Sequence, residues 1–132
     1  KGDITIPPGQ ALTIQPGVIV KFDGFYSLSV AGDLLASGTS NDTIVFTSNK
    51  ANPGWGDWIG IFFTDKNLTL SHIKVEYAYN CIVIYNGNFL IKNSMFRKFN
   101  WAGIIIREGN TTVIGNNFTE YGAPNVGSFT SA

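Results

Sequence analysis

The side chains that could perform acid–base or nucleophilic chemistry are few and form no catalytic pattern. The 132 residues include one histidine, His72, one cysteine, Cys81, and nine Asp and Glu side chains. A single histidine without a partner at matching spacing cannot build a Ser/His/Asp or Cys/His centre. A glycosidase needs two carboxylates within about 5–10 Å, and no such pair is apparent. We therefore predict that the protein is not an enzyme and binds no cofactor or metal.

Aromatic side chains recur at a spacing that could serve binding. Trp55 lies in the stretch 49–58, which contains Asn, Pro and Gly. Four further aromatic residues each stand three residues before a short apolar segment: Phe25, Trp58, Tyr79 and Trp101. Such a ladder could hold sugar rings or pack against a neighbouring molecule. The rings could instead stack on one another and only stiffen the chain at that point.

Four Asn-x-Thr sequons offer a possible modification, because this motif accepts N-linked glycans in exported proteins. They begin at Asn41, Asn67, Asn110 and Asn117. With 13 Asn in the chain, such motifs also arise by chance.

The composition indicates short strands joined by tight turns. Ile and Val together number 23, against 7 Leu and 8 Ala, and there are 15 Gly. β-Branched residues favour strands, while Gly and Asn favour turns. Nine Lys and Arg balance nine Asp and Glu, and the charged fraction is only 14%. This balance excludes the basic surface of a nucleic-acid-binding protein, and no apolar run reaches the length of a membrane span.

Three sets of alternating apolar pairs recur along the chain. The first set is Ile4/Ile6, Leu28/Val30, Ile61/Phe63, Ile82/Ile84 and Ile104/Ile106. The second is Leu12/Ile14, Leu34/Ala36, Leu68/Leu70, Phe89/Ile91 and Thr111/Val113. The third is Val20/Phe22, Ile44/Phe46, Ile73/Val75, Ser94/Phe96 and Asn116/Phe118. The usual step of 21–24 residues predicts about five coils of three strands in one domain, residues 1–132, with an insertion near 49–58.

Chain segments that fit this repeat resemble right-handed parallel β-helix proteins. The resemblance is clearest in Gly-Asp-Leu-Leu-Ala-Ser-Gly-Thr and Ile-Val-Phe-Thr-Ser within residues 32–48, in residues 12–22 and in residues 57–61. It implies an all-β solenoid of the kind found in secreted and cell-surface proteins of bacteria and archaea. An antiparallel sandwich also uses short strands, but it does not require recurrence at every third strand.

The repeat also predicts which residues face outward and which polar residues pair. On the first strand of the last three coils the outward residues are apolar, Phe62, Val83 and Ile105, and a stacked apolar stripe usually marks an interface. Glu76 and Arg97 are one coil apart and predict an ion pair at the surface. His72 occupies the place of Asn93 and Gly115 and is therefore expected in a turn.

The terminal coils are a second expected interface. Ile4 and Ile6 open the first coil, and Val126 is expected to start a sixth coil. No capping helix is apparent, so either the chain is cut from a longer solenoid or its coil ends stack on other copies.

These features favour a structural function over two alternatives. The first hypothesis is an extracellular, self-assembling protein of a sheath, surface layer or filament, with copies of itself or neighbouring cell-surface proteins as partners. The second is a carbohydrate-binding or carbohydrate-cleaving module that uses the aromatic ladder. An ice or crystal binder would need a regular Thr array, and Leu35 and Leu90 interrupt the row of Thr13, Thr69 and Thr112.

Overall fold

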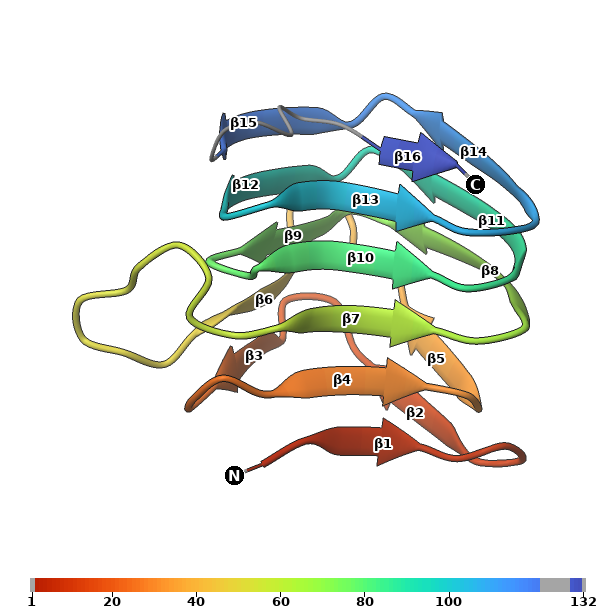
Figure 1. The fold of residues 1–132 in the computed structure, drawn as a ribbon, viewed down its shortest axis with the longest axis horizontal. Coiled ribbons are helices and arrows are strands. Elements are labelled where there is room, and N and C mark those ends of the chain that lie inside the picture. The colour runs from red at the N-terminus through yellow and green to blue at the C-terminus, as the bar shows by residue number, and fades with distance from the viewer. Residues whose placement is uncertain (1, 122–128, 132) are drawn as a thin grey trace.

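The computed structural model describes residues 2–121 and 129–131, and these form a right-handed parallel β-helix of about five coils. In Figure 1 the front strands run from left to right and the chain returns behind them. Each coil lies above the previous one, which makes the winding right-handed. The described residues contain strands and no helix. The predicted fold class is therefore confirmed.

Each coil contributes one strand to each of three faces, here called sheets A, B and C. Sheet A contains β1 (Ile4–Ile6), β4 (Ser27–Val30), β7 (Gly60–Phe63), β10 (Asn80–Ile84), β13 (Ala102–Ile106) and β16 (Phe129–Ser131). Sheet B contains β2 (Ala11–Ile14), β5 (Asp33–Ala36), β8 (Lys66–Ser71), β11 (Gly87–Lys92) and β14 (Asn110–Ile114). Sheet C contains β3 (Ile19–Phe22), β6 (Ile44–Ser48), β9 (Ile73–Glu76), β12 (Met95–Phe99) and β15 (Asn117–Tyr121).

The first two apolar sets have the predicted register. In sheet A, Ile61 pairs with Ile82 and Ile82 with Ile104, and all three are at most 1% exposed. In sheet B, Leu70 pairs with Ile91. Like residues therefore stack through the interior from coil to coil, and this continuous apolar column is the core.

The third set is wrong at its first step. Val20 pairs with Phe46 and Phe22 with Ser48, two residues beyond the predicted partners. A shift of two leaves every side chain on the same face, because strands alternate with a period of two. In this register Phe22 lies against Trp58 of the insertion, which enters the core, and the two rings stack with centroids 4.0 Å apart.

Sheet B is interrupted between its second and third strands. β2 pairs with β5, and β11 pairs with β8 and β14, but among the described residues the two groups share no strand pairing beyond the isolated bridge Ser37–Ser71. An ion pair also links the two groups, since Lys66 Nζ of β8 lies 3.6 Å from Asp33 Oδ1 of β5. Sheets A and C are continuous between the second and third coils, where β4 pairs with β7 and β6 pairs with β9, so they hold the first two coils to the rest.

The strand that follows the fifth coil also differs from the prediction. Phe129 pairs with Ile104, so Phe129 occupies the register expected for Val126. Val126 itself lies outside the described residues.

The corners repeat one backbone conformation. His72, Asn93 and Gly115 join sheet B to sheet C with φ of 51°, 51° and 67°, which confirms the turn predicted for His72. A left-handed residue at this place in successive coils bends the chain, and Asn and Gly adopt it at low cost.

Trp58 is the substitution site that best tests this packing. It is fully buried, and its Nε1 donates a hydrogen bond of 2.9 Å to the Glu76 carbonyl oxygen. We expect Trp58→Ala to reduce the free energy of unfolding by about 3–5 kcal/mol in urea titrations. Trp101→Ala is the matched control, since Trp101 is 41% exposed and its loss should cost less than about 1 kcal/mol. Equal losses would contradict the assigned core.

Candidate functional site

The outer face of sheet A carries the predicted apolar stripe. Phe62, Val83 and Ile105 lie in register on three successive coils. Phe62 and Ile105 are half-buried, whereas Val83 between them is only 3% exposed. In the first two coils the same row holds Thr5 and Ser29. The stripe therefore presents two accessible apolar side chains on either side of a covered valine.

Tyr85 extends this stripe and was not found from the sequence. Its ring is 47% exposed and lies 6.3 Å from the Phe62 ring, with 21° between the planes. A groove of about 340 Å³ lies beside the two rings, and Ser29 and Ile59 contribute to its walls. Tyr85 comes directly after the β10 strand, where the two-residue alternation no longer predicts which way a side chain points. The stripe and Tyr85 are called the sheet A surface below.

The aromatic ladder is only partly at the surface. Phe25, Tyr79 and Trp101 are 60%, 38% and 41% exposed. The prediction of Trp58 as a ligand contact is wrong, because this ring is fully buried against the core. Tyr79 and Trp101 lie on adjacent coils, and the backbone N–H of Trp101 donates a hydrogen bond of 2.9 Å to the backbone carbonyl oxygen of Tyr79.

The insertion brings Trp55 to the same corner. Residues 49–58 form the large loop on the left of Figure 1, at the side where β10 and β13 begin. Gly56 packs against the Asn100 side chain, since a Cβ there would lie 3.2 Å from Asn100 Nδ2. Trp55 is 46% exposed next to this contact. Trp55, Tyr79 and Trp101 are called the aromatic corner below.

Asp57 holds the loop in shape. Its carboxylate accepts hydrogen bonds of 2.8 Å from Lys50 Nζ, from the Gly54 nitrogen and from Ser48 Oγ. Partial burial raises the pKa of Asp57, but the bonds from Lys50, Gly54 and Ser48 outweigh it, so the net pKa lies below the usual 3.8. The ionised carboxylate is therefore a structural clamp.

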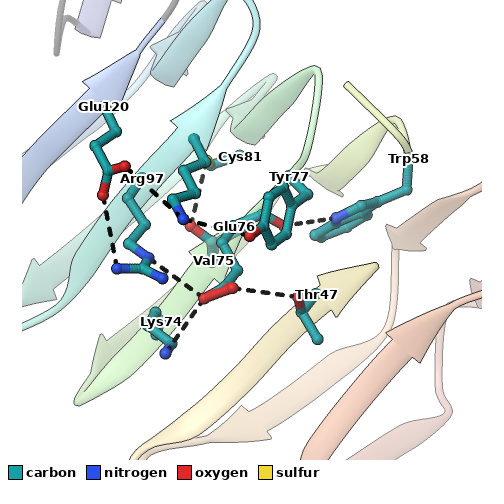
Figure 2. A network of polar contacts seen from close by, with 10 residues as sticks. Thr47, Trp58, Lys74, Val75, Glu76, Tyr77, Cys81, Arg97 and Glu120 are labelled. Carbon is teal, nitrogen blue, oxygen red and sulfur yellow. Dashed lines mark hydrogen bonds and ion pairs between the residues drawn. The ribbon is translucent and has the colours of Figure 1, made fainter. Parts of the chain in front are cut away.

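A charged network covers the outer face of sheet C (Figure 2). Glu76 pairs with Lys74 at 3.2 Å and Arg97 at 3.4 Å, and its other oxygen accepts a hydrogen bond of 3.4 Å from Thr47. Arg97 also pairs with Glu120 at 3.7 Å. The predicted Glu76–Arg97 pair is present, but it is not the surface pair expected, because the Glu76 side chain is only 9% exposed. Charges on neighbouring coils enclose the carboxylate, so the network fastens coils together.

The remaining residues predicted from the sequence are either exposed at the surface or buried in the core. Ile4 is 44% exposed and Ile6 is buried in the first coil. The sequon residues Asn41, Asn67, Asn110 and Asn117 are all exposed. Cys81 is fully buried, and burial raises the pKa of its thiol well above the ordinary value, which makes it unreactive. Within residues 2–121 and 129–131, no group of three His, Cys, Asp or Glu side chains is placed to hold a metal ion.

The charged network predicts unequal effects of two glutamate substitutions. Glu76→Gln leaves Arg97 and Lys74 without their buried partner, so we expect a loss of about 1–3 kcal/mol in the free energy of unfolding. Glu120→Gln removes a partner that is 48% exposed and should cost below about 1 kcal/mol. Urea denaturation at low and high salt measures both. A larger effect at Glu120 would contradict the assigned role of Glu76.

The clamp at Asp57 predicts a pH dependence. Because its pKa is lower in the folded chain, its stabilisation is complete above about pH 5 and is lost as the pH falls through the folded value below 3.8. We expect the Tm difference between the unmodified chain and Asp57→Asn to be constant near neutrality and to shrink in acid. A difference that stays constant down to about pH 2 would exclude the clamp.

Comparisons with known proteins give one local similarity. A segment of 48 residues, 36% of this chain, is 44% identical to the Drosophila melanogaster protein named Protein bark beetle. The matched segment makes up 2% of that protein's length. No family model and no solved structure matches the chain. In the part of the chain that the structure describes, no helix is long and apolar enough to cross a bilayer.

Proposed function

We propose that this chain is a non-catalytic structural protein outside the cell, which assembles with copies of itself or with neighbouring cell-surface proteins. The observation that carries the proposal is the sheet A surface, on which Phe62, Ile105 and the exposed Tyr85 present apolar area across three coils. Apolar side chains that gather on one face of a protein often mark an interaction site. A sheath, surface layer or filament of the bacterial or archaeal type fits this chemistry.

Charge and strand pairing support the same proposal. Nine acidic and nine basic side chains give no net charge that would repel a second copy. Successive strands of sheet A pair in parallel and in register, and the same pairing between copies would continue the core through Ile4 and Ile6. Such a head-to-tail contact is heterologous and produces a filament or a ring.

The aromatic corner supports a second candidate, carbohydrate binding. Tyr79 and Trp101 expose their rings on adjacent coils, and Trp55 lies in the loop beside them. Exposed aromatic rings at a shared edge can stack on sugar faces while their polar ends stay in water. A glycan-array signal that Trp101→Ala abolishes, with folding retained, would support this candidate over self-assembly.

Self-association measured by light scattering after size exclusion tests the first proposal. We expect the mass to rise with concentration, and a Phe62→Asp, Ile105→Lys double variant to associate at least about tenfold more weakly. Each large apolar side chain buried contributes about 1.5–3 kcal/mol, and about 1.4 kcal/mol is tenfold in affinity.

The matched control places the same charges on sheet B. Leu35→Asp with Ile114→Lys changes two apolar residues that are each 58% exposed, and it should leave association unchanged. Circular dichroism establishes that both variants fold. A monomer at every concentration would contradict the assembly proposal, and release of reducing sugar from polysaccharides would contradict the absence of catalysis.

A further inference from the structure

All four sequons lie on the side of the solenoid formed by sheets B and C. Asn67 and Asn110 are in β8 and β14 of sheet B, and Asn117 opens β15 of sheet C. Asn41 lies in the turn that joins β5 to β6, at the corner between these two sheets. The strands of sheet A contain no sequon. The side that carries the sequons is therefore distinct from the sheet A surface.

The four sequon amides are also exposed and uncommitted. Within the described residues, none of their Nδ2 atoms donates a hydrogen bond, and Asn67 uses only its Oδ1, which accepts from the Asn88 nitrogen at 3.0 Å. Three asparagines outside the sequons, Asn49, Asn86 and Asn116, do donate from Nδ2. Asn86 Nδ2 donates to Asp65 and Asn116 Nδ2 to the Ile91 carbonyl oxygen, both at 2.8 Å. The fold thus leaves the amide nitrogens of the four sequons available for modification.

We propose that Asn41, Asn67, Asn110 and Asn117 carry N-linked glycans, which cover sheets B and C and leave the sheet A surface bare for contact with a partner. The inference rests on the proposed extracellular function. In the transfer, Nδ2 bonds to C1 of an oligosaccharide as the bond from C1 to a polyprenyl diphosphate breaks. The amide loses one proton and the lipid diphosphate leaves.

Exposed apolar residues on sheet B lie where these glycans would cover them. Leu35 is 58% exposed and lines a groove of about 500 Å³ together with Asn67. A second groove of about 580 Å³ continues along the sheet between Asn67 and Asn110, with Leu90 in its floor. A glycan on either asparagine would shield apolar area that is otherwise open to water. The sheet A surface has no such cover.

Secretion from a eukaryotic cell tests the sites directly. The whole chain is expressed behind a secretion signal, and peptide-N-glycosidase treatment with peptide mass spectrometry reports occupancy. Four single variants each remove one sequon hydroxyl: Thr43→Ala, Thr69→Ala, Thr112→Ala and Thr119→Ala. Each variant should lack one glycan and therefore migrate faster on a gel, by the shift that one glycan causes. A secreted, folded chain without sugar at any of the four asparagines would overturn the proposal.

A glycan placed on the sheet A surface tests whether that face must stay bare. Phe62→Asn creates a sequon with Phe63 and Thr64, and Phe62→Asn with Thr64→Ala is the same substitution without the sequon. We expect the glycosylated unmodified chain to associate and the glycosylated Phe62→Asn chain to stay monomeric. The control, Phe62→Asn with Thr64→Ala, should associate more strongly than the glycosylated Phe62→Asn chain, because it carries no glycan on this face.

The two proposals fail in different ways. Occupied sites on a chain that stays monomeric with and without its sugars would support the glycan sites and overturn the assembly function. Association that appears only after enzymatic removal of the four native glycans would overturn the proposal that they leave the interface bare.

Discussion

The in-register stacking of parallel coils is the constraint on which the rest of this structure depends. One coil has no interior of its own, so its inward side chains are buried only by the matching residues of the coils above and below. Ile61, Ile82 and Ile104 illustrate this in sheet A, where each pairs with the next and none is more than 1% exposed. The same register stacks the outward residues. A surface stripe such as Phe62, Val83 and Ile105 therefore follows from the packing of the core.

Stacking also determines what the potentially reactive residues do. In the last three coils the corner between sheets B and C has a left-handed residue, and His72 fills that place in the third coil with φ of 51°. Cys81 lies in the core, where burial keeps its thiol protonated. Glu76 is neutralised by cations from its own coil and the next one. Three residues that could take part in chemistry elsewhere are thus used to build the solenoid.

The outer faces of sheets A, B and C differ in chemistry, although the three sheets belong to one solenoid. Sheet A is apolar at Phe62 and Ile105, sheet C carries the Glu76 network, and sheet B displays Asn and Thr around shallow grooves. A solenoid separates such faces because each outward row follows one strand position through all coils. Contact with partners and modification by glycans can therefore occupy different sides of one small protein.

The sequence by itself determined the coils, because alternation with a period of two and recurrence every 21–24 residues are both written in the order of residues. It identified the apolar stripe and the Glu76–Arg97 pair for the same reason. Only the tertiary structure decided the features near the insertion, where the repeat is broken. There Trp58 enters the core and stacks on Phe22, and β3 pairs with β6 two residues beyond the predicted partners, a shift that alternation cannot detect. The burial of Glu76 and the position of Tyr85 were also decided by tertiary structure, since both depend on side chains from neighbouring coils rather than on local sequence.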